Sequence, residues 1–294
     1  MPKTKLNNYI HLHFLVFIWG FTAILGALIS IEAIPLVWYR MFFAVLFLLI
    51  YFLVKKKSLK ASPKALLKFL FTGIIIALHW VAFFSAIKVA NVSVALVAMS
   101  TGALFTSLIE PLFFNRRFIF LEVFFGLIVI IGLYLIFKVE SSYTLGIIYA
   151  LIAAFLSALF TVLNGLYIKK HEAEVITFYQ LLFGVGFITI YVLFASNFSI
   201  QDFKLNNSDI FYLLILSSIC TAYAFVVSVK IMKHLTPYTV MLTINLEPIY
   251  GILLALLIFG EKEKMSPQFY IGASVIIITV IINGILKNKK KHIN

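Results

Sequence analysis

The residues best suited to chemistry in this sequence are a glutamate and a proline inside an apolar run. Glu247 and Pro248 lie within residues 237–259, a run long enough to cross a bilayer at about 1.5 Å per residue. An ionised side chain at that depth costs about 2.5–3.5 kcal/mol on insertion scales, and proline removes a backbone donor from the helix. Because lipid would solvate neither feature, we predict that Glu247 faces a polar cavity inside a helical bundle.

Glu247 has two possible chemical roles in such a cavity. It could hold a proton, since apolar surroundings disfavour the charged form of a carboxyl, or it could pair with a cationic group of a substrate. The structural alternative is a protonated glutamate that bonds a neighbouring helix. Asn245 points to a different side of a helix, where it could contact substrate or bond another helix.

A second candidate group combines a histidine with aromatic rings. Phe83 follows His79 by four positions and Trp80 by three, so all three side chains can line one face of a helix. Imidazole titrates near pH 6.5 when unperturbed and often carries protons. We predict that these three residues bind an organic substrate and that His79 joins Glu247 in proton coupling. An interhelical hydrogen bond with aromatic packing is the alternative.

Four further residues complete the predicted site. Arg40 could bind a substrate carboxylate or a counter-ion such as Glu32, or its side chain could snorkel to the outer interface. Trp19 and Thr101 are predicted substrate contacts, although such residues also serve helix packing. Glu110 lies near the end of its apolar segment and is predicted to sit at the inner mouth.

The composition shows which elements must position these residues. Hydrophobic residues make up 63% of the chain and charged residues 12%, whereas soluble domains carry about 25% charged residues. We therefore predict an all-α polytopic membrane protein. Ten apolar segments can be drawn, at residues 9–30, 34–54, 66–87, 91–113, 119–138, 145–168, 175–195, 209–231, 237–259 and 268–286.

The basic residues predict how the chain is oriented in the membrane. The formal net charge is +13, and most of the 24 Lys and Arg residues fall in loops on the same side as the N-terminus. That side is expected to be cytoplasmic, with both termini there. The excess charge is thereby explained without a nucleic-acid partner. The single cysteine, Cys220, lies in an apolar segment and excludes an intrachain disulfide.

A weak internal repeat divides the chain in two. An offset of 146 residues lays the third to fifth segments over the eighth to tenth and pairs Ser93 with Thr239 and Gly126 with Gly272. Five segments per unit is an odd number, so the second unit must insert with inverted orientation, as in many secondary transporters. We predict two inverted five-helix repeats, at residues 1–140 and 141–294. The same offset aligns Thr101 with Glu247, so the first repeat has no acidic residue at the equivalent position.

Several stretches carry a resemblance to a known family: Trp19-Gly20, Pro35, Tyr39-Arg40, Leu242 to Glu263 with its Gly260-Glu261 end, and Gly272. They resemble the drug/metabolite transporter (DMT) superfamily in its EamA-type branch. The resemblance implies ten helices in two repeats and an inner-membrane carrier that often moves amino acids or drugs outward. Gly102 and Asn115 depart from the pattern, since proline and glutamate often occur there.

These observations favour a secondary transporter that exports small metabolites by alternating access, with proton coupling, exchange or facilitated flux. An exchanger of nucleotide sugars or other organic anions is the alternative, and an intramembrane enzyme or accessory protein is a weaker one. Metalloprotease, hydrolase and Walker motifs are absent from the sequence, so we expect no enzyme activity, no metal and no cofactor. The expected partners are a small-molecule substrate and the lipid bilayer, for a monomer or weak homodimer.

Overall fold

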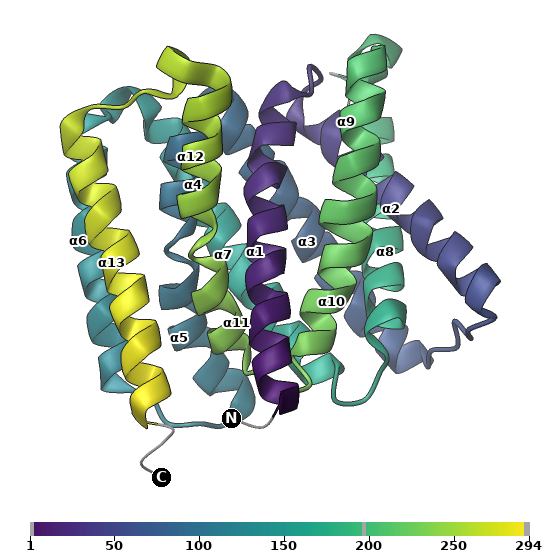
Figure 1. The fold of residues 1–294 in the computed structure, drawn as a ribbon. Helices are drawn as coiled ribbons and strands as arrows, with labels where there is room; N and C mark the ends of the chain where they lie inside the picture. The colour runs from purple at the N-terminus through teal and green to yellow at the C-terminus, as the bar shows by residue number, and fades with distance from the viewer. Residues whose placement is uncertain (1–2, 196–197, 291–294) are drawn as a thin grey trace.

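The computed structural model describes residues 3–195 and 198–290, and all regular secondary structure within them is helical (Figure 1). The predicted cytoplasmic ends, residues 1–2 and 291–294, lie outside this range. The first half contains α1 (Lys3–Leu28), α2 (Ala33–Lys55), α3 (Pro63–Val89), α4 (Val92–Met99), α5 (Gly102–Phe114) and α6 (Phe120–Val139). The second half contains α7 (Thr144–Tyr167), α8 (Ala173–Phe194), α9 (Asn207–Ser217), the π-helix η3 (Ser218–Tyr223), α10 (Ala224–Ile231), α11 (Pro237–Ile244), α12 (Glu247–Phe259), the 3₁₀ helix η4 (Gly260–Glu263) and α13 (Pro267–Lys290).

Eight helical stretches of the described chain are long and apolar enough to cross a membrane. Four of them join consecutive elements, at Val92–Phe114, Ser141–Tyr167 (the 3₁₀ helix η1, Ser141–Tyr143, followed by α7), Asn207–Ile231 and Pro237–Glu263. Two shorter apolar helices, Phe120–Ile136 and Pro267–Asn283, fall where further segments were predicted. The prediction of an all-α, multi-pass membrane protein is therefore confirmed.

Corresponding helices of the two halves pack against each other in opposite directions. Trp38, early in α2, donates a hydrogen bond to Thr189, late in α8, at 2.8 Å. Tyr51, late in α2, donates to Glu174, early in α8, at 3.3 Å. Helices α6 and α13 also lie side by side (Figure 1). This antiparallel pairing fits two repeats of inverted orientation.

Two segments that the apolar pattern predicts as continuous helices are broken near the middle. Helix α11 ends at Ile244 and α12 begins at Glu247, with Pro248 in the first turn, where proline is tolerated. Helix α4 ends at Met99 and α5 begins at Gly102, although that segment contains no proline at its break. The offset of 146 residues superimposes these breaks to within a residue, so the missing proline does not make the repeats asymmetric here.

Local hydrogen bonds explain the break that lacks a proline. The hydroxyl of Ser100 donates to the carbonyl of Leu96, and the hydroxyl of Thr101 donates to the carbonyl of Ala98 at 2.8 Å. Serine and threonine side chains that bond their own backbone compete with the helical ladder. Asn245, at the other break, donates to the carbonyl of Ser100. The two interruptions therefore meet and satisfy each other's polar groups.

Helices α3 and α8 approach closely through glycine, which gives a test of the packing. A Cβ atom on Gly73 would collide with the backbone carbonyl of Gln180, which cannot move aside cheaply. A Cβ atom added to Gly186 would have no atom of another helix within 4 Å. We expect Gly73→Ala to destabilise the protein by about 1–3 kcal/mol and Gly186→Ala to be neutral. Thermal unfolding in detergent measures both, and equal melting temperatures would contradict the assigned α3–α8 contact.

Candidate functional site

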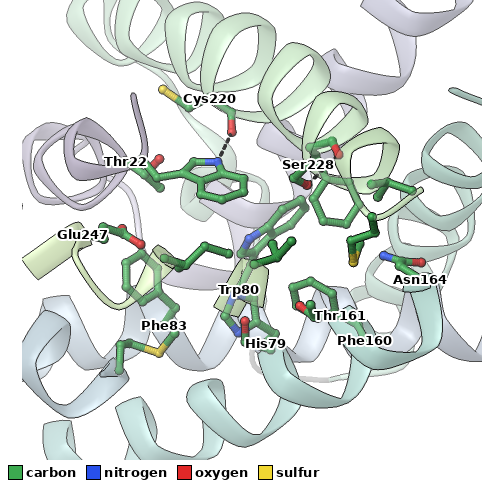
Figure 2. Close-up of a pocket in the computed structure, with 18 of the residues that line it drawn as sticks. Thr22, His79, Trp80, Phe83, Phe160, Thr161, Asn164, Cys220, Ser228 and Glu247 are labelled. Carbon is green, nitrogen blue, oxygen red and sulfur yellow. Dashed lines mark hydrogen bonds between the residues drawn. The ribbon is translucent and has the colours of Figure 1, made fainter. Parts of the chain in front are cut away.

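A cavity of about 80 Å³ lies between the two repeats, beside the paired helix breaks (Figure 2). Its volume is several times the roughly 10–15 Å³ that one water molecule needs. The first repeat contributes Trp19, Thr22, Arg40, His79, Trp80, Phe83 and Met99. The second contributes Ser157, Phe160, Thr161, Asn164, Cys220, Phe225, Ser228, Val229, Met232, Val240, Ile244 and Glu247. Six of the predicted site residues thus come together: Trp19, Arg40, His79, Trp80, Phe83 and Glu247.

Glu247 is the first residue of α12 and lines one end of the cavity, near Thr22 and Phe83 (Figure 2). The helix dipole at this position favours a negative charge, although Pro248 has no N–H and the N–H of Ile249 already bonds the carbonyl of Leu246. Within the described residues, its carboxylate forms neither a side-chain hydrogen bond nor an ion pair. The helix break therefore holds a carboxylate that is available to a solute in the cavity.

His79 is buried and its orientation is fixed by one hydrogen bond. Its Nδ1 lies 2.7 Å from the carbonyl of Ala153 on α7. A carbonyl can only accept, so Nδ1 carries the proton, and Nε2 makes no hydrogen bond to any residue described. The ring lies parallel to Phe83 at 6.3 Å and edge-on to Phe160 at 5.2 Å. The predicted histidine–aromatic group therefore lies on α3 of the first repeat and packs against α7 of the second.

Arg40 does not snorkel to the outer interface as one prediction allowed. Its side chain is only 2% exposed, because it turns inward from α2 to the cavity, whereas Glu32 is exposed. The guanidinium lies 4.1 Å from the ring centre of Trp80, and Nε donates to the hydroxyl of Thr221 at 2.7 Å. Nη1 is buried without a hydrogen-bond partner in the described structure. The proposed pairing with Glu32 is absent from the described residues.

The π-helix η3 supports this side of the cavity. Trp19 donates from its indole nitrogen to the carbonyl of Cys220 at 3.1 Å, drawn as a dashed line in Figure 2. Thr221, the next residue, holds Arg40. π-Helical turns leave backbone groups free for such contacts and frequently occur at functional sites. Nothing in the hydrophobic pattern signals this turn, so sequence reasoning missed Thr221.

Several lining residues were also missed, although one had a detectable signal. Phe225 lies 146 positions after His79, and both line the cavity. The internal repeat could therefore have identified Phe225. Thr161 and Asn164 come from α7, where no sequence pattern singled them out, and they lie at the end of the cavity opposite Glu247 (Figure 2).

Three predicted site residues do not line the cavity. Thr101 and Asn245 are buried in the paired helix breaks, where their side chains bond backbone carbonyls. Glu110 is also buried, and its carboxylate accepts from the backbone N–H of Tyr238 at 2.7 Å and lies 3.4 Å from Nε of Arg116. It therefore caps the start of α11 and is not among the residues that line this cavity.

A second glutamate caps the other broken helix in the same way. The carboxylate of Glu263 accepts from the backbone N–H groups of Val92 and Ser93, each at 3.0 Å, and from the Ser93 hydroxyl at 2.9 Å. These groups begin α4, where a negative charge is favoured. Each broken helix thus starts on a glutamate that the opposite repeat supplies.

Comparison with known proteins agrees with this architecture. The sequence matches the EamA-like transporter family over residues 9–138 and again over 144–285. The fold resembles 29 chains of solved structures, including one crystal structure with a TM-score of 0.71 at 15% identity, which covers 96% of this chain and 98% of its own. At that identity the likeness shows the fold alone. No curated protein matches the sequence. Because two successive family matches cover nearly the whole chain, this protein belongs to the EamA-like transporter family of the DMT superfamily.

Proposed function

We propose that this protein is a secondary transporter that exports small organic metabolites, amino acids foremost, across the inner membrane by alternating access. One observation carries the proposal: Glu247, whose carboxylate has no ion pair among the described residues, lines a cavity between two inverted repeats. Substrate sites of secondary transporters lie at such repeat interfaces, where broken helices meet. Family membership supports transport in general, and the site supports the choice of solute.

The lining favours a solute with an ammonium group and an apolar body. Glu247 offers a negative charge, and the rings of Trp80, Phe83, Phe160 and Phe225 offer apolar and π surfaces. A nucleotide-sugar or organic-anion exchanger would need several cations. Arg40 is the single lysine or arginine among the described lining residues, and Lys88 instead bonds the carbonyl of Ile29. The anion exchanger is therefore the less supported function.

Transport would follow from movement of one repeat relative to the other around this cavity. The interrupted helices provide hinges, because residues at helix ends can absorb changes in backbone angles. Glu247 would bind either a proton or the substrate ammonium, and His79 would supply the second proton-carrying group. The driving force would be a proton gradient or exchange. In this mechanism the helix breaks act as hinges and the cavity binds the solute that is moved.

The topology that completes the proposal has ten membrane crossings with both termini in the cytoplasm. The two repeat units would be residues 1–140 and 141–294, and the protein would act as a monomer or weak homodimer. The short apolar helices Phe120–Ile136 and Pro267–Asn283 would provide the fifth and the tenth crossings along the chain.

Tryptophan fluorescence can test whether solutes bind in this cavity. The chain has three tryptophans, of which Trp19 and Trp80 line the cavity and Trp38 does not. In purified Trp38→Phe protein, leucine or phenylalanine is expected to change the emission at concentrations that also saturate efflux from liposomes. Transport without any such change would place the substrate elsewhere, and a lack of flux for amino acids, amines and organic anions would refute a transporter.

A further inference from the structure

Arg40 occupies an environment that a cation rarely occupies without a compensating anion. It is 2% exposed within a predicted membrane span and forms no ion pair with the residues that the structure describes. Removing a charge from water without a partner costs several kcal/mol. The ring of Trp80 and the hydroxyl of Thr221 offset part of this cost, but Nη1 has no partner. Nη1 can therefore donate to one further acceptor, and an anion there would also balance the buried charge.

We propose that Arg40 is the binding site for a substrate carboxylate and that Thr221, in the π-helix, is its positioning residue. The inference rests on the proposed transport function and narrows it. Arginine suits this ligand because its planar, permanently charged guanidinium matches carboxylate geometry. With Glu247 on the same cavity, the two charges select a zwitterionic amino acid over a simple amine or a simple carboxylate.

The π-helix gives Thr221 the orientation that this role needs. Its hydroxyl donates to the carbonyl of Leu216, five residues earlier, at 2.7 Å. The hydroxyl has one proton, so it is committed as an acceptor toward Arg40 Nε. This contact and the face of Trp80 together hold the guanidinium plane and leave Nη1 for the ligand.

The charges around Arg40 argue against a purely structural role. Glu247 faces the same cavity, and the two charges attract each other, but they form no ion pair in the described structure. A structural arginine in a membrane would be expected to pair directly with that carboxylate. A solute between the two groups would instead neutralise each charge with its own opposite end.

Thr221→Val tests the positioning role because it keeps the shape of the side chain and removes the hydroxyl. In liposomes, the KM for phenylalanine and for leucine is expected to rise about tenfold, with kcat little changed. The KM or inhibition constant of the decarboxylated analogues phenethylamine and isoamylamine should change less than about twofold. Thr221→Ser restores the hydroxyl and should restore the KM for the amino acids.

Ser217→Ala is the matched control, because it removes a buried hydroxyl one turn earlier that contacts no hydrogen-bond partner in the described structure. It should leave all four constants unchanged. An equal effect of Thr221→Val on amino acids and amines, or no effect on either, would overturn the carboxylate site. If the protein transported the amines but not the amino acids, the carboxylate site would also be overturned, although the proposed transport function would stand. Absence of flux for every solute would instead refute the proposed function.

Discussion

Replacement of Glu247 by glutamine is expected to reduce gradient-driven transport roughly 100-fold, the effect of removing one partner from a desolvated charge interaction. Glutamine keeps the size of the side chain but can neither bind a proton nor neutralise an ammonium group. Glu247 lies at the start of α12 and faces the cavity without an ion pair in the described chain. No neighbouring carboxylate lines the described cavity to take over its role.

Proteoliposomes with an imposed proton gradient measure this prediction directly. The wild-type protein should accumulate or expel phenylalanine in response to the gradient. Glu247→Gln should transport phenylalanine far more slowly, and its flux should not respond to the gradient. Glu172→Gln is the control, because that side chain is 67% exposed and pairs only loosely with Lys233 at 3.7 Å. A Glu247→Gln protein that still follows the gradient would show that the proton is carried elsewhere, with His79 as the next residue to test.

Replacement of Glu263 by glutamine is expected to destabilise the protein by about 3 kcal/mol. The carboxylate accepts three hydrogen bonds at the start of α4, from the N–H groups of Val92 and Ser93 and from the Ser93 hydroxyl. Glutamine replaces one acceptor oxygen by an NH₂ group, so one donor would face another donor in a buried site. Charge-assisted bonds at a helix N-terminus would also be lost.

The temperature of half-unfolding in detergent, followed by circular dichroism, measures the loss. Glu261→Gln is the matched control, because this residue belongs to the same η4 turn but its side chain is 85% exposed. The control should melt like the wild-type protein, and Glu263→Gln several degrees lower. If both variants melted together, the cap would contribute nothing to stability, and the reciprocal capping by the two repeats would lose its energetic basis.

The sequence was enough to predict the fold class because the relevant energies are local. Transfer of apolar residues into lipid depends on composition and segment length, so ten apolar runs predict a polytopic helical protein. The cost of a charge at mid-membrane likewise depends on position alone, which is why Glu247 could be assigned to a cavity. The spacing of His79, Trp80 and Phe83 on one helical face was equally readable, and all three line that cavity.

Only the tertiary structure decided the roles that depend on partners far along the chain. Asn245 was an equally good candidate for substrate or helix contact until Ser100, 145 residues away, proved to be its acceptor. Glu110 and Glu263 became helix caps because the opposite repeat brings α11 and α4 to them. A sequence pattern contains no distance between such residues, so it could not assign these bonds.

Arg40 shows the same limit for the site itself. From its sequence position, the Arg40 side chain could snorkel to the outer interface, pair with Glu32 or contact a substrate. The π-turn at Thr221 decided among them, because it places an acceptor where the guanidinium can turn inward onto Trp80. Apolar periodicity does not distinguish a π-turn from an α-turn. The sequence by itself therefore determined the membrane fold and the carboxylate within a membrane span, while packing between the repeats decided which side chains face the cavity with it.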